Sequence, residues 1–159
     1  HVLKWIDPNF IKYSWLDRGS DERQYCAPGI DLPIASILRT KYGRYPEYHT
    51  SLDNLENVVT PKGLDGGYWA IRKAIEAIER NKKYKITVLC EPQMGKRGLY
   101  PTLSTKDTNK EVLLMMNFIS FCDGQTSLLE IAESLNLPIW ELYELVDKLE
   151  SHSLIGVNE

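Results

Sequence analysis

Apolar side chains recur at helical spacing after residue 60, and this spacing predicts a helix. Thr60-Pro61 is a typical helix start, with Thr as the N-cap and Pro at the first helical position. The helix should end near Asn81-Lys82-Lys83, where cations favour the helix dipole. One face of it is apolar, and we expect this face to pack in a core: Tyr68, Ile71, Ile75 and Ile78.

Three shorter runs are rich in aromatic and β-branched residues and predict strands. Phe10–Leu16 follows the turn signal Asp7-Pro8-Asn9, and Pro33–Leu38 is a short apolar run typical of a buried strand. Tyr84–Cys90 alternates in the manner of a third strand. Together with the helix they predict the fold class α/β, in which polar loops beyond the strand ends carry the chemistry.

The last third of the sequence predicts a winged helix. Residues 109–122 form a strongly apolar helix, Ser127 and Glu130 form a capping box, and a further helix restarts after Asn136-Leu137-Pro138. Leu154–Val157 is a candidate terminal strand, so that helix, turn, helix and strand follow one another. We expect one core that buries Leu113, Met116, Phe118, Ile131, Leu135, Leu142, Val146 and Leu149.

Charge divides the chain unevenly. Residues 1–106 hold 17 basic and 12 acidic side chains, whereas residues 107–159 hold 2 basic and 10 acidic ones. The change of sign near residue 106 suggests a domain boundary. We therefore predict an α/β domain over residues 1–91, a connecting segment over 92–106 and the winged-helix domain over 107–159.

The same charge distribution excludes DNA as the expected partner of the winged helix. Duplex binding depends on Lys and Arg side chains that neutralise phosphates. The helix that would enter the groove instead carries four acidic residues against Lys148 alone: Glu141, Glu144, Asp147 and Glu150. A packing or protein-contact role is the better prediction.

Length and composition indicate a globular chain. Its 159 residues are 43% hydrophobic, and no stretch of about 18 apolar residues predicts a membrane span. The N-terminus has no charged-then-apolar leader and reads as the continuation of an element already under way. Three widely spaced cysteines argue against a disulfide framework, which favours a cytoplasmic location.

Candidate chemistry lies in two polar segments, Asp17–Arg23 and the Tyr48-His49 pair. On composition alone the first is more often a solvated turn, and a His after a Tyr is more often a surface residue than a metal ligand. The order of residues changes this balance. Ser20-Asp21-Glu22, then Tyr25, Gly29-Ile30-Asp31-Leu32-Pro33 and finally Tyr48-His49-Thr50-Ser51-Leu52-Asp53 resemble, in sequence, the last motifs of co-catalytic zinc aminopeptidases and glutaminyl cyclases.

A narrower resemblance covers essentially the whole chain. The segments GSDERQYC, YPEYHTSLD and CEPQMGKRGLYPTLS are similar to a bacterial aminopeptidase-like family that adds a C-terminal winged helix. This resemblance implies a partial zinc-aminopeptidase-like sheet with flanking helices, and a peptide or small amide as substrate.

The resemblance also implies roles for individual residues. His49 corresponds to a zinc ligand, and Tyr48 to a tyrosine that hydrogen-bonds the tetrahedral oxyanion. Asp21 corresponds to a residue of the active-site hydrogen-bond network, whereas Glu22 replaces the His of the motif. We group Glu22 with Arg18 and Arg23 as substrate-binding candidates; the two arginines could grip a substrate carboxylate or could pair with Asp17, Asp21 and Glu22.

The remaining ligands of a two-zinc site cannot be matched in this sequence. The chain therefore resembles the C-terminal part of a larger zinc hydrolase and should be inactive alone. The alternative is a non-catalytic binding or assembly module that uses its acidic winged helix for protein contact. We expect either self-association or contact with the missing N-terminal part, and no nucleic-acid or membrane partner.

Overall fold

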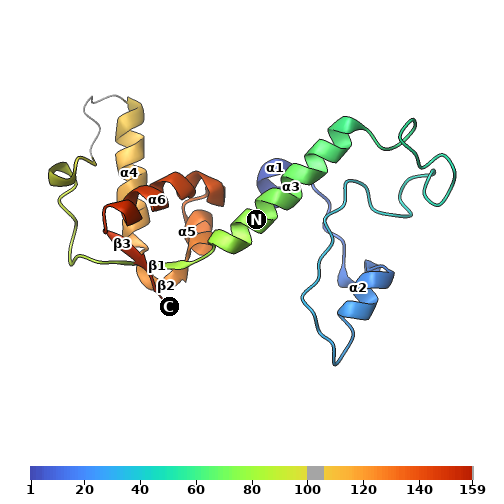
Figure 1. Cartoon of the computed structure of the whole chain (residues 1–159), viewed down its shortest axis with the longest axis horizontal. Coiled ribbons are helices and arrows are strands. Elements are labelled where there is room, and N and C mark those ends of the chain that lie inside the picture. Colours follow the sequence, from blue (N-terminus) through green and yellow to red (C-terminus); the bar gives the residue numbers. More distant parts are fainter. Residues whose placement is uncertain (100–105, 159) are drawn as a thin grey trace. The chain divides into compact units, whose positions relative to one another are not determined.

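The chain divides into two compact units in the computed structural model, which describes residues 1–99 and 106–158 (Figure 1). One unit consists of His1–Val2 and Ile75–Glu159, and the other of Leu3–Ala74. Part of the predicted connecting segment, residues 100–105, lies outside the described residues.

The first unit contains a winged helix, as the sequence predicted. Its sheet has the order β2-β1-β3 and is antiparallel, with Lys83 opposite Ser127 and Tyr84 opposite Val157. The other elements are the helices α4, α5 and α6 and the short 3-10 helices η2 and η3. The bounds are β1 Lys83–Ile86, η2 Gly95–Arg97, α4 Lys106–Ser120, β2 Asp123–Ser127, α5 Leu128–Ser134, η3 Ile139–Leu142, α6 Tyr143–Ser151 and β3 Ile155–Val157.

Two strands of this sheet differ from the sequence prediction. The predicted strand Tyr84–Cys90 exists only as far as Ile86, and it pairs within the winged helix rather than in an α/β sheet. Strand β2 was not predicted, because its sequence DGQTS is polar and resembles a turn. Strand β2 forms because it pairs with the edge of β1, and this pairing outweighs the low strand propensity of its own residues.

The core of this unit is formed by the helices and the inner side of the sheet. Five of the eight predicted core residues are buried: Phe118, Ile131, Leu142, Val146 and Leu149. Met116 and Leu135 are half-buried. The prediction that Leu113 is buried is wrong, since this side chain is 61% exposed. Helix α4 buries a different stripe, Met115, Phe118, Ile119 and the following Cys122. Because this helix is apolar on most sides, its spacing alone could not select the buried face.

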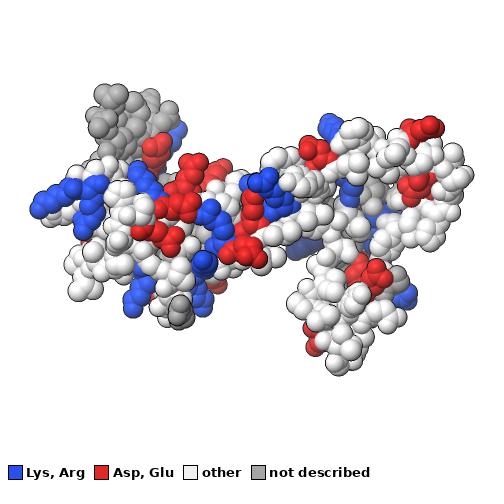
Figure 2. All heavy atoms as spheres, viewed as in Figure 1, with Lys and Arg blue, Asp and Glu red and all other residues white. Residues whose placement is uncertain are grey.

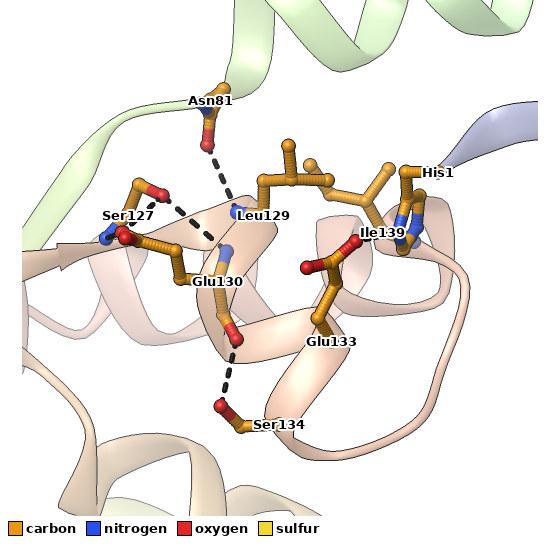
Figure 3. Close-up of polar contacts among 8 residues, drawn as sticks. All are labelled: His1, Asn81, Ser127, Leu129, Glu130, Glu133, Ser134 and Ile139. Atoms are coloured by element: carbon orange, nitrogen blue, oxygen red, sulfur yellow. Dashed lines mark hydrogen bonds and ion pairs between the residues drawn. The ribbon is translucent and has the colours of Figure 1, made fainter.

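Hydrogen bonds from side chains fix the start of α5 (Figure 3). The Glu130 backbone N–H donates to Ser127 Oγ at 3.3 Å, and the Ser127 N–H donates to Glu130 Oε2 at 2.8 Å, which confirms the capping box. The Ser127 hydroxyl also holds the pKa of Glu130 below its ordinary value. The Leu129 N–H donates to Asn81 Oδ1 at 2.9 Å. The end of α3 is thereby tied to the first turn of α5.

His1 caps the next helical segment in the same view (Figure 3). The Ile139 N–H donates to His1 Nε2 at 2.9 Å, and His1 Nδ1 lies 3.5 Å from a Glu133 carboxylate oxygen. The His1 ring also meets the Trp140 ring edge-on at 6.5 Å. The beginning of the chain is therefore part of the winged-helix unit.

The second unit consists of helices and irregular segments. Its elements are α1 Val2–Ile6, η1 Trp15–Asp17, α2 Ser20–Tyr25 and the N-terminal part of α3 Pro61–Arg80. The predicted N-cap of α3 is confirmed, because the Gly63 N–H donates to Thr60 Oγ1 at 3.0 Å. Residues 26–60 form turns and bends without a helix or strand.

The predicted strands Phe10–Leu16 and Pro33–Leu38 are wrong for this structure, because neither segment forms a strand. Within the described part of the chain, residues 11–13 and 35–38 make no backbone–backbone hydrogen bond. A strand is stable only when a neighbour satisfies its N–H and C=O groups. The α/β sheet predicted for this region is therefore not present; the described sheet is the small antiparallel one.

The predicted burial of the apolar face of α3 is also wrong. Tyr68, Ile71, Ile75 and Ile78 are 57%, 47%, 55% and 75% exposed, whereas the helical pattern predicted that they pack in a core. Among the described residues of Leu3–Ala74, Ala70 is the one buried apolar side chain. Nearly all of the buried apolar residues described therefore belong to the winged-helix unit.

We predict that Leu142→Ala lowers the free energy of unfolding of the winged-helix unit by about 2–5 kcal/mol, because it leaves a cavity at a fully buried position. The matched control Leu113→Ala, at an exposed position, should change it by less than about 0.5 kcal/mol. Urea unfolding followed by circular dichroism measures both. Equal losses in the two variants would contradict the assignment of the core.

A second prediction concerns the loss of stability at low pH. Because the pKa of Glu130 is lowered in the folded protein, its carboxylate contributes stability that is present above pH 4.5 and is lost as the pH falls through the folded pKa. Glu130→Gln should therefore destabilise the protein at pH 7, and the difference from the unmodified chain should shrink towards pH 3. Urea midpoints across this range measure the effect, with Glu144→Gln as the control; a pH-independent difference would contradict the carboxylate's role.

Candidate functional site

The polar segment of the first motif is organised around the start of α2. Glu22 Oε2 accepts the Gly19 N–H at 3.0 Å, and the Ser36 hydroxyl donates to Glu22 Oε1. The hydrogen bond from Ser36 is the main reason that the pKa of Glu22 lies below its ordinary value. Glu22 is therefore a fixed carboxylate near neutral pH. Asp21 lies beside it in the first turn and is exposed.

Both arginines of this motif are positioned by backbone oxygens. Arg18 Nη1 donates to the Trp15 carbonyl at 3.0 Å, and its guanidinium lies 4.6 Å from the centre of the Trp15 ring. Arg23 Nε donates to the Gly19 carbonyl at 3.2 Å. In the described part of the chain neither arginine forms an ion pair with Asp17, Asp21 or Glu22. The sequence left two roles open for the arginines, binding of a substrate carboxylate or ion pairing within this segment. Hydrogen bonds to backbone oxygens, and not such ion pairs, hold the two side chains.

The second motif lies in a loop rich in tyrosine. The centre of the Tyr48 ring lies 4.1 Å from that of the His49 ring, on which it stacks. The Tyr42 and Tyr45 ring centres lie 6.1 and 5.7 Å from that of Tyr48. The Tyr45 hydroxyl donates to Asp53 Oδ2 at 2.9 Å, which raises the pKa of Tyr45. The motif's tyrosine, histidine and aspartate are thereby connected through ring contacts and one hydrogen bond.

His49 has an unusual backbone conformation. Its φ is +62°, in the left-handed region, and its side chain is exposed. Such a conformation costs about 1–3 kcal/mol for a residue other than glycine, although His tolerates it better than most. A strained exposed histidine supports the hypothesis of a functional site.

Tyr42 brings the two motifs together. Its hydroxyl donates to the Asp17 carbonyl at 3.4 Å, and its ring faces Tyr48. A Cβ at position 19 would collide with the Tyr42 hydroxyl, so Gly19 permits this approach. Lys41 lies over the Tyr42 ring at 4.1 Å and also contributes to the low pKa of Glu22.

These contacts define a loop cluster that contains the sequence-predicted site residues: Arg18, Asp21, Glu22, Arg23, Tyr48 and His49. The structure joins its two halves through Tyr42, and the described residues show no hydrogen bond or ion pair between Asp21 and His49. Sequence reasoning missed Ser36 and Tyr42. The repeat of Tyr42, Tyr45 and Tyr48 at intervals of three was a signal for a ring cluster, whereas nothing marked Ser36.

The donor set of the loop cluster does not make a complete zinc site. Zinc in proteins takes three or four side-chain ligands, usually His, Cys, Asp or Glu. Among the described residues no three such side chains lie close enough together to hold a metal ion. His49 supplies one imidazole, and at least part of a complete ligand set would have to come from outside the described residues.

None of the described helices combines the length and the apolar character that a membrane span requires.

A curated protein of Clostridium acetobutylicum is similar to most of this chain. It is named "Putative polysaccharide biosynthesis protein with aminopeptidase-like domain" and is 41% identical over 133 residues. The match covers 82% of this chain and 30% of the relative. The chain therefore spans less than a third of the length of that relative.

A solved structure is also similar to this chain. The crystal structure of a "putative peptidase" from Clostridium acetobutylicum aligns with a TM-score of 0.76 and 31% sequence identity. The alignment covers 98% of this chain and 34% of the solved chain. One relative is thus named for an aminopeptidase-like domain and the other as a putative peptidase, and this chain aligns with about a third of each.

Two families match consecutive parts of the sequence. Residues 82–157 match a family described as winged helix-turn-helix, in agreement with the sheet and helices of the first unit. Residues 1–81 match the family described as "Domain of unknown function (DUF4910)". This match spans half of the chain and contains the loop cluster, so the chain belongs to the DUF4910 family.

Proposed function

We propose that this chain is the C-terminal part of a zinc-dependent aminopeptidase-like hydrolase and contributes one side of its active site. The observation that carries the proposal is the loop cluster, in which the two motifs of the predicted site meet through Tyr42 and Gly19. The aminopeptidase-like relatives support the reaction class, hydrolysis of a peptide or amide bond.

The loop cluster suggests a division of roles. His49 is the proposed zinc ligand, because a neutral imidazole is a good donor to zinc and this one is exposed. When bound, the metal would activate water and polarise the scissile carbonyl. Tyr48 carries a phenolic donor next to His49 and would hydrogen-bond the oxyanion that develops on that carbonyl.

The other half of the loop cluster would bind substrate. Arg18 and Arg23 are held by backbone oxygens, which leaves further N–H groups of each guanidinium to bind a substrate carboxylate. Glu22 is fixed as a carboxylate by Ser36 and Gly19, and Asp21 would extend the same hydrogen-bond network.

We also propose that residues 3–74 belong to a zinc-aminopeptidase-like α/β domain. A zinc-aminopeptidase-like sheet would require partner strands from outside this chain, since residues 3–74 contain no described strand. The chain alone would lack both the sheet and most of the zinc ligands, and we therefore expect it to be inactive by itself.

His49→Asn tests the metal assignment in the intact protein that contains this chain. Asn tolerates the left-handed backbone at this position but is a far poorer zinc ligand. We expect the zinc content to fall and hydrolysis of aminoacyl-4-nitroanilides to drop by at least about 100-fold. His152→Asn, at an exposed position in the winged helix, is the matched control and should leave both quantities unchanged.

Tyr48→Phe separates the two roles, because it should lower kcat by about 100- to 1,000-fold while zinc is retained. An intact protein that binds no zinc and hydrolyses no peptide or amide would refute the proposed function. Full activity in the His49→Asn variant would refute the residue assignment.

A second candidate function is protein contact through the winged helix, and a groove favours it. The groove has a volume of about 300 Å³, and its lining combines apolar and acidic side chains with one cation: Leu99, Glu111, Val112, Leu114, Met115, Glu141, Glu144, Leu145 and Lys148. On the face drawn in Figure 2, acidic side chains gather over α6. Such a surface suits a basic, partly apolar protein segment and would repel phosphates.

Glu141→Lys combined with Glu144→Lys tests this electrostatic argument. The unmodified chain should not bind duplex DNA at physiological salt, and the double variant should gain salt-dependent binding. Glu79→Lys combined with Glu91→Lys makes the same change of charge outside the groove and is the control. Fluorescence anisotropy with a labelled duplex measures the difference. DNA binding by the unmodified chain that the Glu141/Glu144 variant does not strengthen would contradict the protein-contact role.

A further inference from the structure

One face of α3 is apolar along almost the whole helix. We call Leu64, Tyr68, Ile71, Ile75 and Ile78 the α3 stripe; their intervals of four, three, four and three residues place them on one side. Each of the five side chains is between 47% and 75% exposed. The helix rises about 1.5 Å per residue, so the stripe is roughly 20 Å long.

The remaining positions of α3 show which way the helix should face. The charged side chains of the helix occupy positions outside the stripe: Lys62, Asp65, Arg72, Lys73, Glu76, Glu79 and Arg80. A helix with one apolar and one charged side normally turns its apolar side to a core. The α3 stripe is therefore a surface built for burial and not a scatter of single exposed residues.

The unit that contains the first half of the stripe has no core of its own to receive it. Ala70 is its one buried apolar side chain among the described residues. Outside α3 this unit exposes further large apolar residues, including Ile11 at 71% and Leu16 at 86%. A unit of this kind corresponds to part of a domain whose remaining layers are supplied from elsewhere.

The relatives indicate what supplies those layers. The solved peptidase chain aligns with 98% of this chain, yet the alignment covers only 34% of that longer chain. The curated relative is likewise matched over 30% of its length. Two thirds of each aminopeptidase-like relative therefore has no counterpart here and is available to cover an apolar helix face.

We propose that the α3 stripe is the interface through which this chain packs on the remainder of the aminopeptidase-like domain. The occupant has an apolar surface at least as long as the stripe and carries no charge opposite its centre, because the five stripe positions hold no charged or hydrogen-bonding group except the Tyr68 hydroxyl. The interface does not depend on zinc or on catalysis, so it can be tested separately from the proposed function.

Hydrogen exchange provides the main test. In the 159-residue chain alone, residues 61–74 should exchange at least 100-fold faster than the buried segments of the winged helix. In the intact Clostridium acetobutylicum relative, the segment aligned with α3 should be protected to the level of its domain core. Rapid exchange of that segment in the intact relative would overturn the proposal.

Two outcomes in the isolated chain would also overturn it. Slow exchange of residues 61–74 in a monomer would mean that the stripe is already covered within the chain. Slow exchange accompanied by a dimeric mass in light scattering would mean that a second copy of the chain is the occupant.

Capture experiments test the stripe itself. The tagged chain is co-expressed with the Clostridium acetobutylicum relative from which the matched region has been deleted, and co-purification is measured. Leu64→Glu combined with Ile71→Glu should lower capture at least tenfold. Lys62→Glu places the same carboxylate on the opposite side of the helix and should leave capture unchanged. An unaltered helical content by circular dichroism shows that the double variant is folded, and undiminished capture by that variant would contradict the proposal.

Discussion

Burial of apolar side chains is the constraint on which the ordered part of this structure depends. Phe118, Leu128, Ile131 and Ile139 are fully buried in the winged-helix unit, and each such side chain contributes about 1.5–3 kcal/mol relative to exposure. The short strands β1, β2 and β3 would be marginal alone, and the helices that pack around this core make their pairing stable. Residues 3–74 lack a comparable core, and there the chain forms local helices and turns only.

The sequence predicted the winged helix well because its signals are local. A cap at Ser127, a restart near Pro138 and the spacing from Leu142 to Leu149 each depend on a few neighbouring residues. Predictions that depended on distant partners failed. The segment Pro33–Leu38 has the composition of a strand without a neighbour to pair with, and Leu113 lies on the side of an almost wholly apolar helix that the core leaves exposed.

The candidate site shows the same division between local and distant information. Tyr48 and His49 were found because their motif is continuous in the sequence, and the role of each rests on a family resemblance. The contact that joins this motif to Asp17 comes from Tyr42, which is 25 residues away along the chain, and it requires a glycine at position 19. A single sequence gives no sign of this pairing, because the interval of three that relates Tyr42 to Tyr45 and Tyr48 indicates a ring cluster but not its contact with Asp17, and Gly19 is not unusual in composition or spacing.

The lack of a core in residues 3–74 affects the candidate site, because the loop that carries His49 belongs to the same unit. A left-handed residue such as His49 persists only where its surroundings determine the backbone; here its ring stacks on Tyr48, which in turn contacts the rings of Tyr42 and Tyr45. These rings belong to a loop without regular secondary structure, in a unit with one buried alanine. Catalytic groups need a rigid frame to hold their geometry. Covering the apolar surface of residues 3–74 would therefore do more than stabilise the domain, because it would also fix the loop that carries the imidazole.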